Sequence, residues 1–123
     1  MEGLPRREEM QSSAAALYRQ SLSEDPLLVR IALRLQGIES AAGRPFALEP
    51  FLTSTLAKHP EVDAYWDLAG QVALARGERA SAAERFRRAA DIEPENAAYL
   101  GHLAAAEAAR RTQARSTRGA LVG

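Results

Sequence analysis

Three prolines stand at a constant interval in this chain, and the interval limits what the chain can fold into. Pro26, Pro60 and Pro94 are 34 residues apart, and Gly43 and Gly77 are separated by the same distance. A proline disfavours helix at the residue before it, and a glycine can end a helix in a left-handed turn. The two residue types therefore divide the chain into helix–turn–helix units of one length, which is the pattern of a helical repeat architecture.

The spacing predicts an all-α chain of about six helices. Apolar residues recur at helical intervals within the ranges 8–23, 27–42, 47–58, 63–75, 79–91 and 97–112. A half unit over 8–26 opens the chain, full units follow at 29–62 and 63–96, and a terminal helix covers 97–112. We expect 1–112 to form a single domain and 113–123, which has no apolar periodicity, to be a disordered tail.

The unit over 63–96 resembles the tetratricopeptide repeat family. The residues that match the family's pattern in register are Trp66, Gly70, Gly77, Ala82, Phe86, Ala89 and Pro94. Ala69 and Ala73 depart from it, and the unit over 29–62 is more degenerate. The resemblance implies antiparallel helix pairs that stack as an α-solenoid, a right-handed superhelix whose first helices line the concave face. Small residues at Gly70 and Ala82 would let the two helices of a unit approach closely.

Composition narrows the classes of function. The chain is 46% hydrophobic and 26% charged, as is typical of soluble globular proteins. Sixteen basic and sixteen acidic residues cancel, so no net field attracts nucleic acid or an anionic membrane. No cysteine is present, which excludes disulfides, thiolate zinc sites and a cysteine nucleophile.

The chain carries no sign of a membrane or secretory destination. No apolar stretch approaches the roughly 20 residues that span a bilayer. The first ten residues do not have the pattern of a signal peptide. We therefore expect a cytoplasmic protein without a membrane partner, and the bias toward alanine and arginine suggests a bacterial source.

No catalytic constellation is visible, so we expect no enzyme activity, no cofactor and no metal site. Phosphate-binding loops, nucleophile elbows and zinc-protease motifs are all absent. His59 and His102 are the only histidines. Asp63 and Asp67 lie one turn apart, and we expect Asp63 to cap the start of its helix.

Helical periodicity places a candidate partner groove on the first helix of each unit. The expected core stripes are Ile31, Leu35, Ile38 and Ala42 in one helix, and Trp66, Ala69, Gly70 and Ala73 in the other. The candidate groove residues lie largely off these stripes and are Arg30, Leu33, Arg34, Gly37, Asp67, Leu68, Gln71, Leu74 and His102. Leucines there could anchor an apolar, for example helical, segment of another protein. Equally, Leu33 and Leu68 could pack against neighbouring helices of this chain.

The leading interpretation is therefore an adaptor or co-chaperone-like module that binds a partner protein. One branch of the resembled family binds the carboxylate tails of chaperones through lysine, asparagine and arginine side chains. The corresponding positions here are Leu33, Gly37, Leu68, Ala98 and His102, none of which matches, so we expect no such binding.

Two alternatives remain. The end helices carry apolar residues such as Leu17 and Leu100, so a homo-oligomer could cover one of them. The arginines near the C-terminal end could bind nucleic acid weakly: Arg110, Arg111, Arg115 and Arg118. Because no aromatic residues lie among them and they supply few charges, nucleic acid is the less favoured partner.

Overall fold

The computed structural model describes the backbone of residues 7–122 and the side chains of residue 10 and of residues 12–116, and over this range it is all-helical. The six helices are α1 (Arg7–Glu24), α2 (Val29–Ala41), α3 (Glu49–Lys58), α4 (Asp63–Ala75), α5 (Arg79–Ile92) and α6 (Ala97–Val122). The predicted all-α class and number of helices are confirmed, and the first five helices begin and end within a few residues of the expected positions.

The chain divides into two compact units, Met1–Pro50 and Phe51–Gly123. The division falls at the start of α3, between the two helices of the repeat unit expected over 29–62. The first unit contains α1 and α2, and the second contains most of α3 together with α4, α5 and α6. The single domain expected over residues 1–112 stays a prediction.

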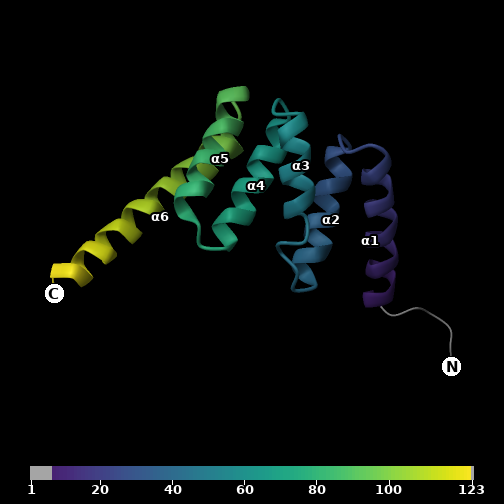
Figure 1. The fold of residues 1–123 in the computed structure, drawn as a ribbon, viewed down its shortest axis with the longest axis horizontal. Helices are drawn as coiled ribbons and strands as arrows, with labels where there is room; N and C mark the ends of the chain where they lie inside the picture. Colours follow the sequence, from purple (N-terminus) through teal and green to yellow (C-terminus); the bar gives the residue numbers. More distant parts are fainter. Residues whose placement is uncertain (1–6, 123) are drawn as a thin grey trace. The chain divides into compact units, whose positions relative to one another are not determined.

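In the first unit, α1 and α2 pack against each other and run in opposite directions (Figure 1). Their buried apolar side chains are Ala15 and Leu22 on α1 and Ala32 and Leu35 on α2. The expected core stripe on α2 is thus correct at Leu35, whereas Ala42 is exposed. The turn between the helices is fixed by Asp25, whose carboxylate accepts a hydrogen bond from the backbone N–H of Leu27 at 3.0 Å.

The two glycines of the repeat end α2 and α4 in the same way. Gly43 and Gly77 have φ of +81° and +83°, a conformation that only glycine adopts without a steric cost. In each case the next residue donates its backbone N–H to the carbonyl five residues earlier: Arg44 to Glu39 at 2.8 Å and Glu78 to Ala73 at 2.9 Å. This is the Schellman arrangement, and it confirms the predicted left-handed helix ends.

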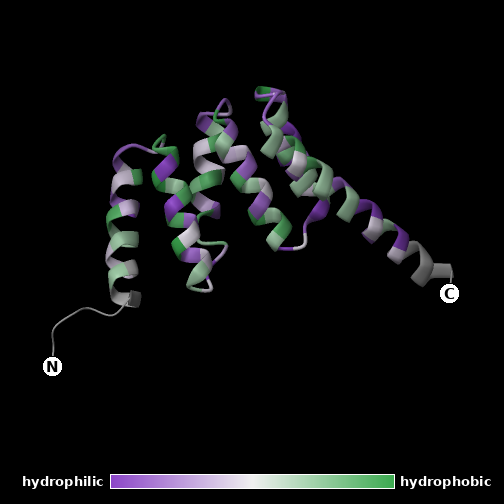
Figure 2. Cartoon of the chain, turned by 180° about the vertical axis from the view of Figure 1, so that it is seen from behind, coloured by the Kyte–Doolittle hydropathy of each residue, from purple (hydrophilic) through white to green (hydrophobic). Residues whose placement is uncertain are grey.

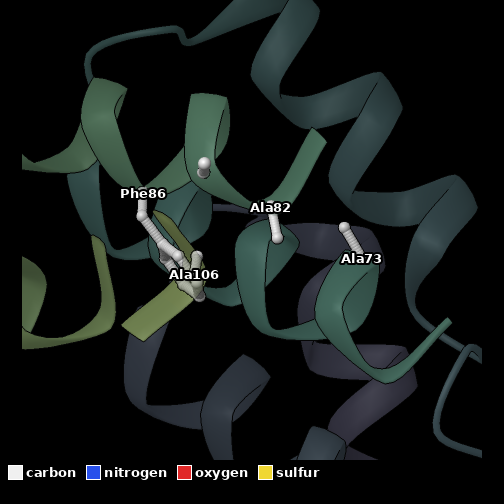
Figure 3. Packing of buried hydrophobic residues seen from close by; sticks show 5 residues of the cluster. Ala73, Ala82, Phe86 and Ala106 are labelled. Carbon is white, nitrogen blue, oxygen red and sulfur yellow. The ribbon is translucent and has the colours of Figure 1, made fainter. Parts of the chain in front are cut away.

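In the second unit, α4, α5 and α6 run in alternating directions (Figure 1). Helix α5 packs against both of the others, and α4 also contacts α6. One core cluster joins Phe86 to small residues on all three helices: Ala73, Ala82, Ala83 and Ala106. Figure 3 shows the Phe86 side chain extending to Ala106 of α6. Small residues thus surround one large ring, which allows the helices to lie close together.

The closest approach of this kind lies between Gly70 and the ring of Phe86. A Cβ atom at Gly70 would stand 2.5 Å from both Cδ1 and Cε1 of that ring. Ala82 is fully buried on the facing helix. The expectation that small residues at these two positions permit close packing of the helix pair is confirmed.

Helix α6 does not end where the sequence suggested. It continues to Val122, beyond the expected end at Thr112, and residue 123 lies outside the described residues. The expected disorder of the tail over 113–123 stays a prediction. Alanine, arginine and glutamine are strong helix formers, and no proline follows residue 112. The side chains over 110–116 are nevertheless all exposed. Hydrophilic and hydrophobic residues alternate along this helix (Figure 2).

None of the helices in the described part of the chain combines the length and the apolar character needed to cross a membrane.

Candidate functional site

The candidate groove residues of the first unit all lie on one face of α2. Arg30, Leu33, Arg34 and Gly37 follow one another at intervals of three, one and three residues, which places them along a single stripe of a helix. All four are exposed, and they lie opposite the buried residues Ala32, Leu35 and Glu39. We refer to these four residues as the α2 stripe.

The candidate residues of the second unit lie on α4, apart from His102 on α6, and they have different environments. Gln71 and Leu74 are exposed, Leu74 at 37% of its surface, whereas Asp67 is buried. Leu68 is only 2% exposed, so the prediction that it faces a partner is wrong.

The reason lies in the position of α4. This helix contacts α5 and α6, and its Tyr65 packs edge-on against Phe51 of α3 with ring centroids 5.5 Å apart. A helix with neighbours on several sides buries more than one stripe of residues. For Leu68, the alternative of packing inside the chain is therefore correct.

Asp67 is the centre of a hydrogen-bonded cluster between α4 and α6. Its Oδ1 lies 2.8 Å from Nδ1 of His102, and its Oδ2 accepts a hydrogen bond from Nε2 of Gln71 at 2.8 Å. The imidazole also lies against the ring of Phe86, with centroids 5.3 Å apart. Both carboxylate oxygens are thus partnered, as a buried carboxylate requires. The hydrogen bond to His102 holds α6 on α4. Among the side chains that the structure describes, at residue 10 and residues 12–116, no group of three or more His, Cys, Asp or Glu residues could hold a metal ion.

A second link between the same two helices involves Tyr99, a residue the sequence analysis did not single out. Its hydroxyl donates a hydrogen bond to Oδ2 of Asp63 at 2.7 Å. Burial raises the pKa of this phenol, and the Asp63 carboxylate raises that pKa further because the ionised phenolate would face a negative charge. Asp63 is the first residue of α4 and makes no capping bond there, so its predicted capping role is wrong. The side chain that caps a helix is Asn96, whose Oδ1 accepts the backbone N–H of Tyr99.

The first unit contains a buried carboxylate that was also missed. Glu39 is 1% exposed, and its two oxygens face the guanidinium groups of Arg19 at 2.9 Å and Arg44 at 3.1 Å. The hydrogen bond from Arg44 is the main reason that the pKa of Glu39 is lowered; Arg19 lowers the pKa too, and burial opposes both. The position of Glu39 one turn after Leu35, on the buried side of α2, was the available signal.

The chain is matched by no family model, and no curated protein is similar to it.

Proposed function

We propose that this chain is a tetratricopeptide-type repeat module that binds another protein through its first helices, α2 and α4. The packing of small residues supports the repeat assignment, because Gly70 lies against Phe86 where the family's pattern requires close approach. The Schellman ends at Gly43 and Gly77, which are 34 residues apart, support a unit of the same length. In this proposal the helix pairs stack as a right-handed α-solenoid.

The observation that carries the binding proposal is the exposure of leucines on these two helices. Leu33 on α2 is 45% exposed and Leu74 on α4 is 37% exposed, although both helices also have well-formed buried faces. A partner that covered these side chains would remove apolar area from water, at about 25 cal/mol per Å². We propose an adaptor-like role without catalysis, in which apolar side chains of the partner cover Leu33 on the first unit and Leu74 on the second.

Site-specific cross-linking would test this proposal. A photoreactive phenylalanine analogue is introduced at Leu33 or at Leu74, and the protein is irradiated in the cells that produce it. The matched control places the same analogue at Ala80, an exposed position on α5. A discrete adduct with another protein from positions 33 and 74, absent from position 80, is the expected result. Equal labelling from all three positions would contradict the proposal.

Self-assembly is the second candidate, and α1 supplies the observation for it. Leu17 is 63% exposed and Met10 is 59% exposed on this helix. A second copy of the chain could cover them. Light scattering at micromolar concentrations would then give a mass that is a multiple of the single chain, and Leu17→Glu would return it to that of one chain. A single-chain mass throughout would rule out this candidate.

A further inference from the structure

The α2 stripe contains two arginines without an acidic partner. No carboxylate stands three or four residues from Arg30 or Arg34 in the sequence, and no described side chain forms an ion pair with either of them. Several other arginines of the described chain are paired, for example Arg44 with Glu39. Because Arg30 and Arg34 are one turn apart, they also repel each other. The stripe therefore presents two adjacent positive charges that nothing in the described chain neutralises.

An apolar side chain and an open backbone lie beside these charges. Leu33 directly precedes Arg34 on the stripe and is 45% exposed. Gly37 follows one turn later, and a Cβ atom placed there would meet nothing within 4 Å. A glycine inside a helix lowers helix stability relative to alanine. No contact with the described residues requires glycine at this position, in contrast to Gly70, which Phe86 approaches closely.

We propose that the α2 stripe binds an acidic peptide segment of a partner protein, in which an apolar side chain is flanked by carboxylates. The carboxylates pair with Arg30 and Arg34 through charge-assisted hydrogen bonds, which are stronger than neutral ones. The apolar side chain covers Leu33, and the peptide backbone passes over Gly37, where no side chain intervenes. This inference rests on the proposed protein-binding function and specifies the chemistry of the partner.

The same charges could attract nucleic acid, but the stripe favours a peptide. Single-stranded nucleic acid is usually bound by aromatic side chains on which bases stack, and the stripe contains none. Two positive charges also release few counterions from a phosphate backbone. An exposed leucine between them matches an apolar side chain of a peptide better than a base.

Selection from a random twelve-residue peptide library on the immobilised full chain would test the proposal. The affinities of the selected peptides are then measured by fluorescence anisotropy for the wild type and for Arg30→Gln/Arg34→Gln. The matched control is Arg111→Gln/Arg115→Gln, which removes the same charge from an exposed arginine pair with the same spacing on α6. Circular dichroism checks that each variant is folded. A single-stranded RNA oligonucleotide is tested in parallel.

We expect the selected peptides to be enriched in aspartate or glutamate next to leucine-like residues. Their affinity should fall about tenfold in Arg30→Gln/Arg34→Gln and stay unchanged in the α6 control. Gly37→Met, which places a side chain over the backbone, should also weaken binding about tenfold without unfolding the chain.

Three results would overturn the proposal. Selected peptides that lack acidic residues, or that bind the arginine variant undiminished, would refute the acidic partner and leave the protein-binding function intact. Binding of RNA that depends on Arg30 and Arg34, with no peptide selected, would replace the peptide by nucleic acid. If neither peptide nor RNA binds, both the acidic partner and the protein-binding function fail.

Discussion

Replacement of Gly70 by alanine tests the close packing of α4 on α5 most directly. The new Cβ atom would stand 2.5 Å from two carbons of the Phe86 ring, which is 1% exposed and has little room to move. Overpacking of a core costs about 1–3 kcal/mol, and a contact this short lies at the upper end of that range. Alanine in place of a helical glycine returns about 1 kcal/mol. The expected net loss in the free energy of unfolding is therefore about 2 kcal/mol.

Chemical denaturation followed by circular dichroism measures this difference, with Gly37→Ala and Gly101→Ala as controls. A Cβ atom at either control position meets nothing within 4 Å, so only the gain in helix propensity remains. Both controls should become more stable by about 0.5–1 kcal/mol. Replacement of glycine by alanine is thus expected to lower the free energy of unfolding at Gly70 and to raise it at the two open positions.

A second substitution tests whether the Phe86 ring causes the loss of stability in Gly70→Ala. Phe86→Leu removes the rigid ring, including the Cε1 atom that Gly70→Ala would approach, so the double variant should lose less stability than the sum of the two single variants. The interaction energy from this double-mutant cycle should be about 1–2 kcal/mol in favour of the double variant. A Gly70→Ala variant as stable as the wild type, or additive effects in the cycle, would refute the packing argument.

Three further predictions concern the buried polar groups. Glu39→Gln should cost about 1–2 kcal/mol at neutral pH, a value reduced because both arginines are half-exposed. Hydrogen bonds from Arg44 and Arg19 lower the pKa of Glu39 in the folded state. The contribution of the ionised side chain to the free energy of unfolding is therefore complete above the unfolded pKa of 4.5, and it disappears as the pH falls through the folded pKa. Acid denaturation curves of wild type and variant should therefore converge at low pH, and a constant difference would contradict this account. Tyr99→Phe should cost about 1.5–2 kcal/mol through the lost bond to Asp63. Burial and the Asp63 carboxylate raise the pKa of Tyr99 in the folded state. The contribution of its hydroxyl to the free energy of unfolding is therefore complete below the unfolded pKa and is lost as the pH rises through the folded pKa. The wild type and Tyr99→Phe should converge in stability only in strong alkali. His102→Ala should cost about 1–2 kcal/mol because one oxygen of the buried Asp67 carboxylate loses its partner, and thermal unfolding at neutral pH would measure it.

Much of the helical framework follows from local sequence signals. Prolines, glycines and apolar spacing were sufficient to predict six helices, because each of these signals acts on the backbone within a few residues. The close contact of Gly70 with Phe86 was also predictable, since small residues in the repeat pattern have a packing role. Where a local signal was missing, prediction failed: no residue marked the end of α6, and the helix continues to Val122.

The environments of individual side chains depend on neighbours that a single helix does not reveal. The periodicity of α4 predicts one core stripe but does not show how many helices surround it, so it places Leu68 outside the core. Glu39 is buried only because two arginines from other parts of the first unit reach its oxygens. Of the candidate site, the α2 stripe is exposed as expected, whereas Asp67 is occupied by bonds within the chain.

The two hydrogen bonds that join α4 to α6 affect how the second unit opens. In a repeat stack each unit contacts only its neighbours, so an end helix held by few contacts can detach while the others remain folded. Here Tyr99 and His102 connect α6 to residues 36 and 35 positions earlier in the chain, on the far side of α5 in sequence. Loss of α6 would expose the Asp67 carboxylate and part of the Phe86 core at the same time. The amide hydrogens of α4 and α5 should therefore exchange with solvent in one cooperative event that includes the start of α6.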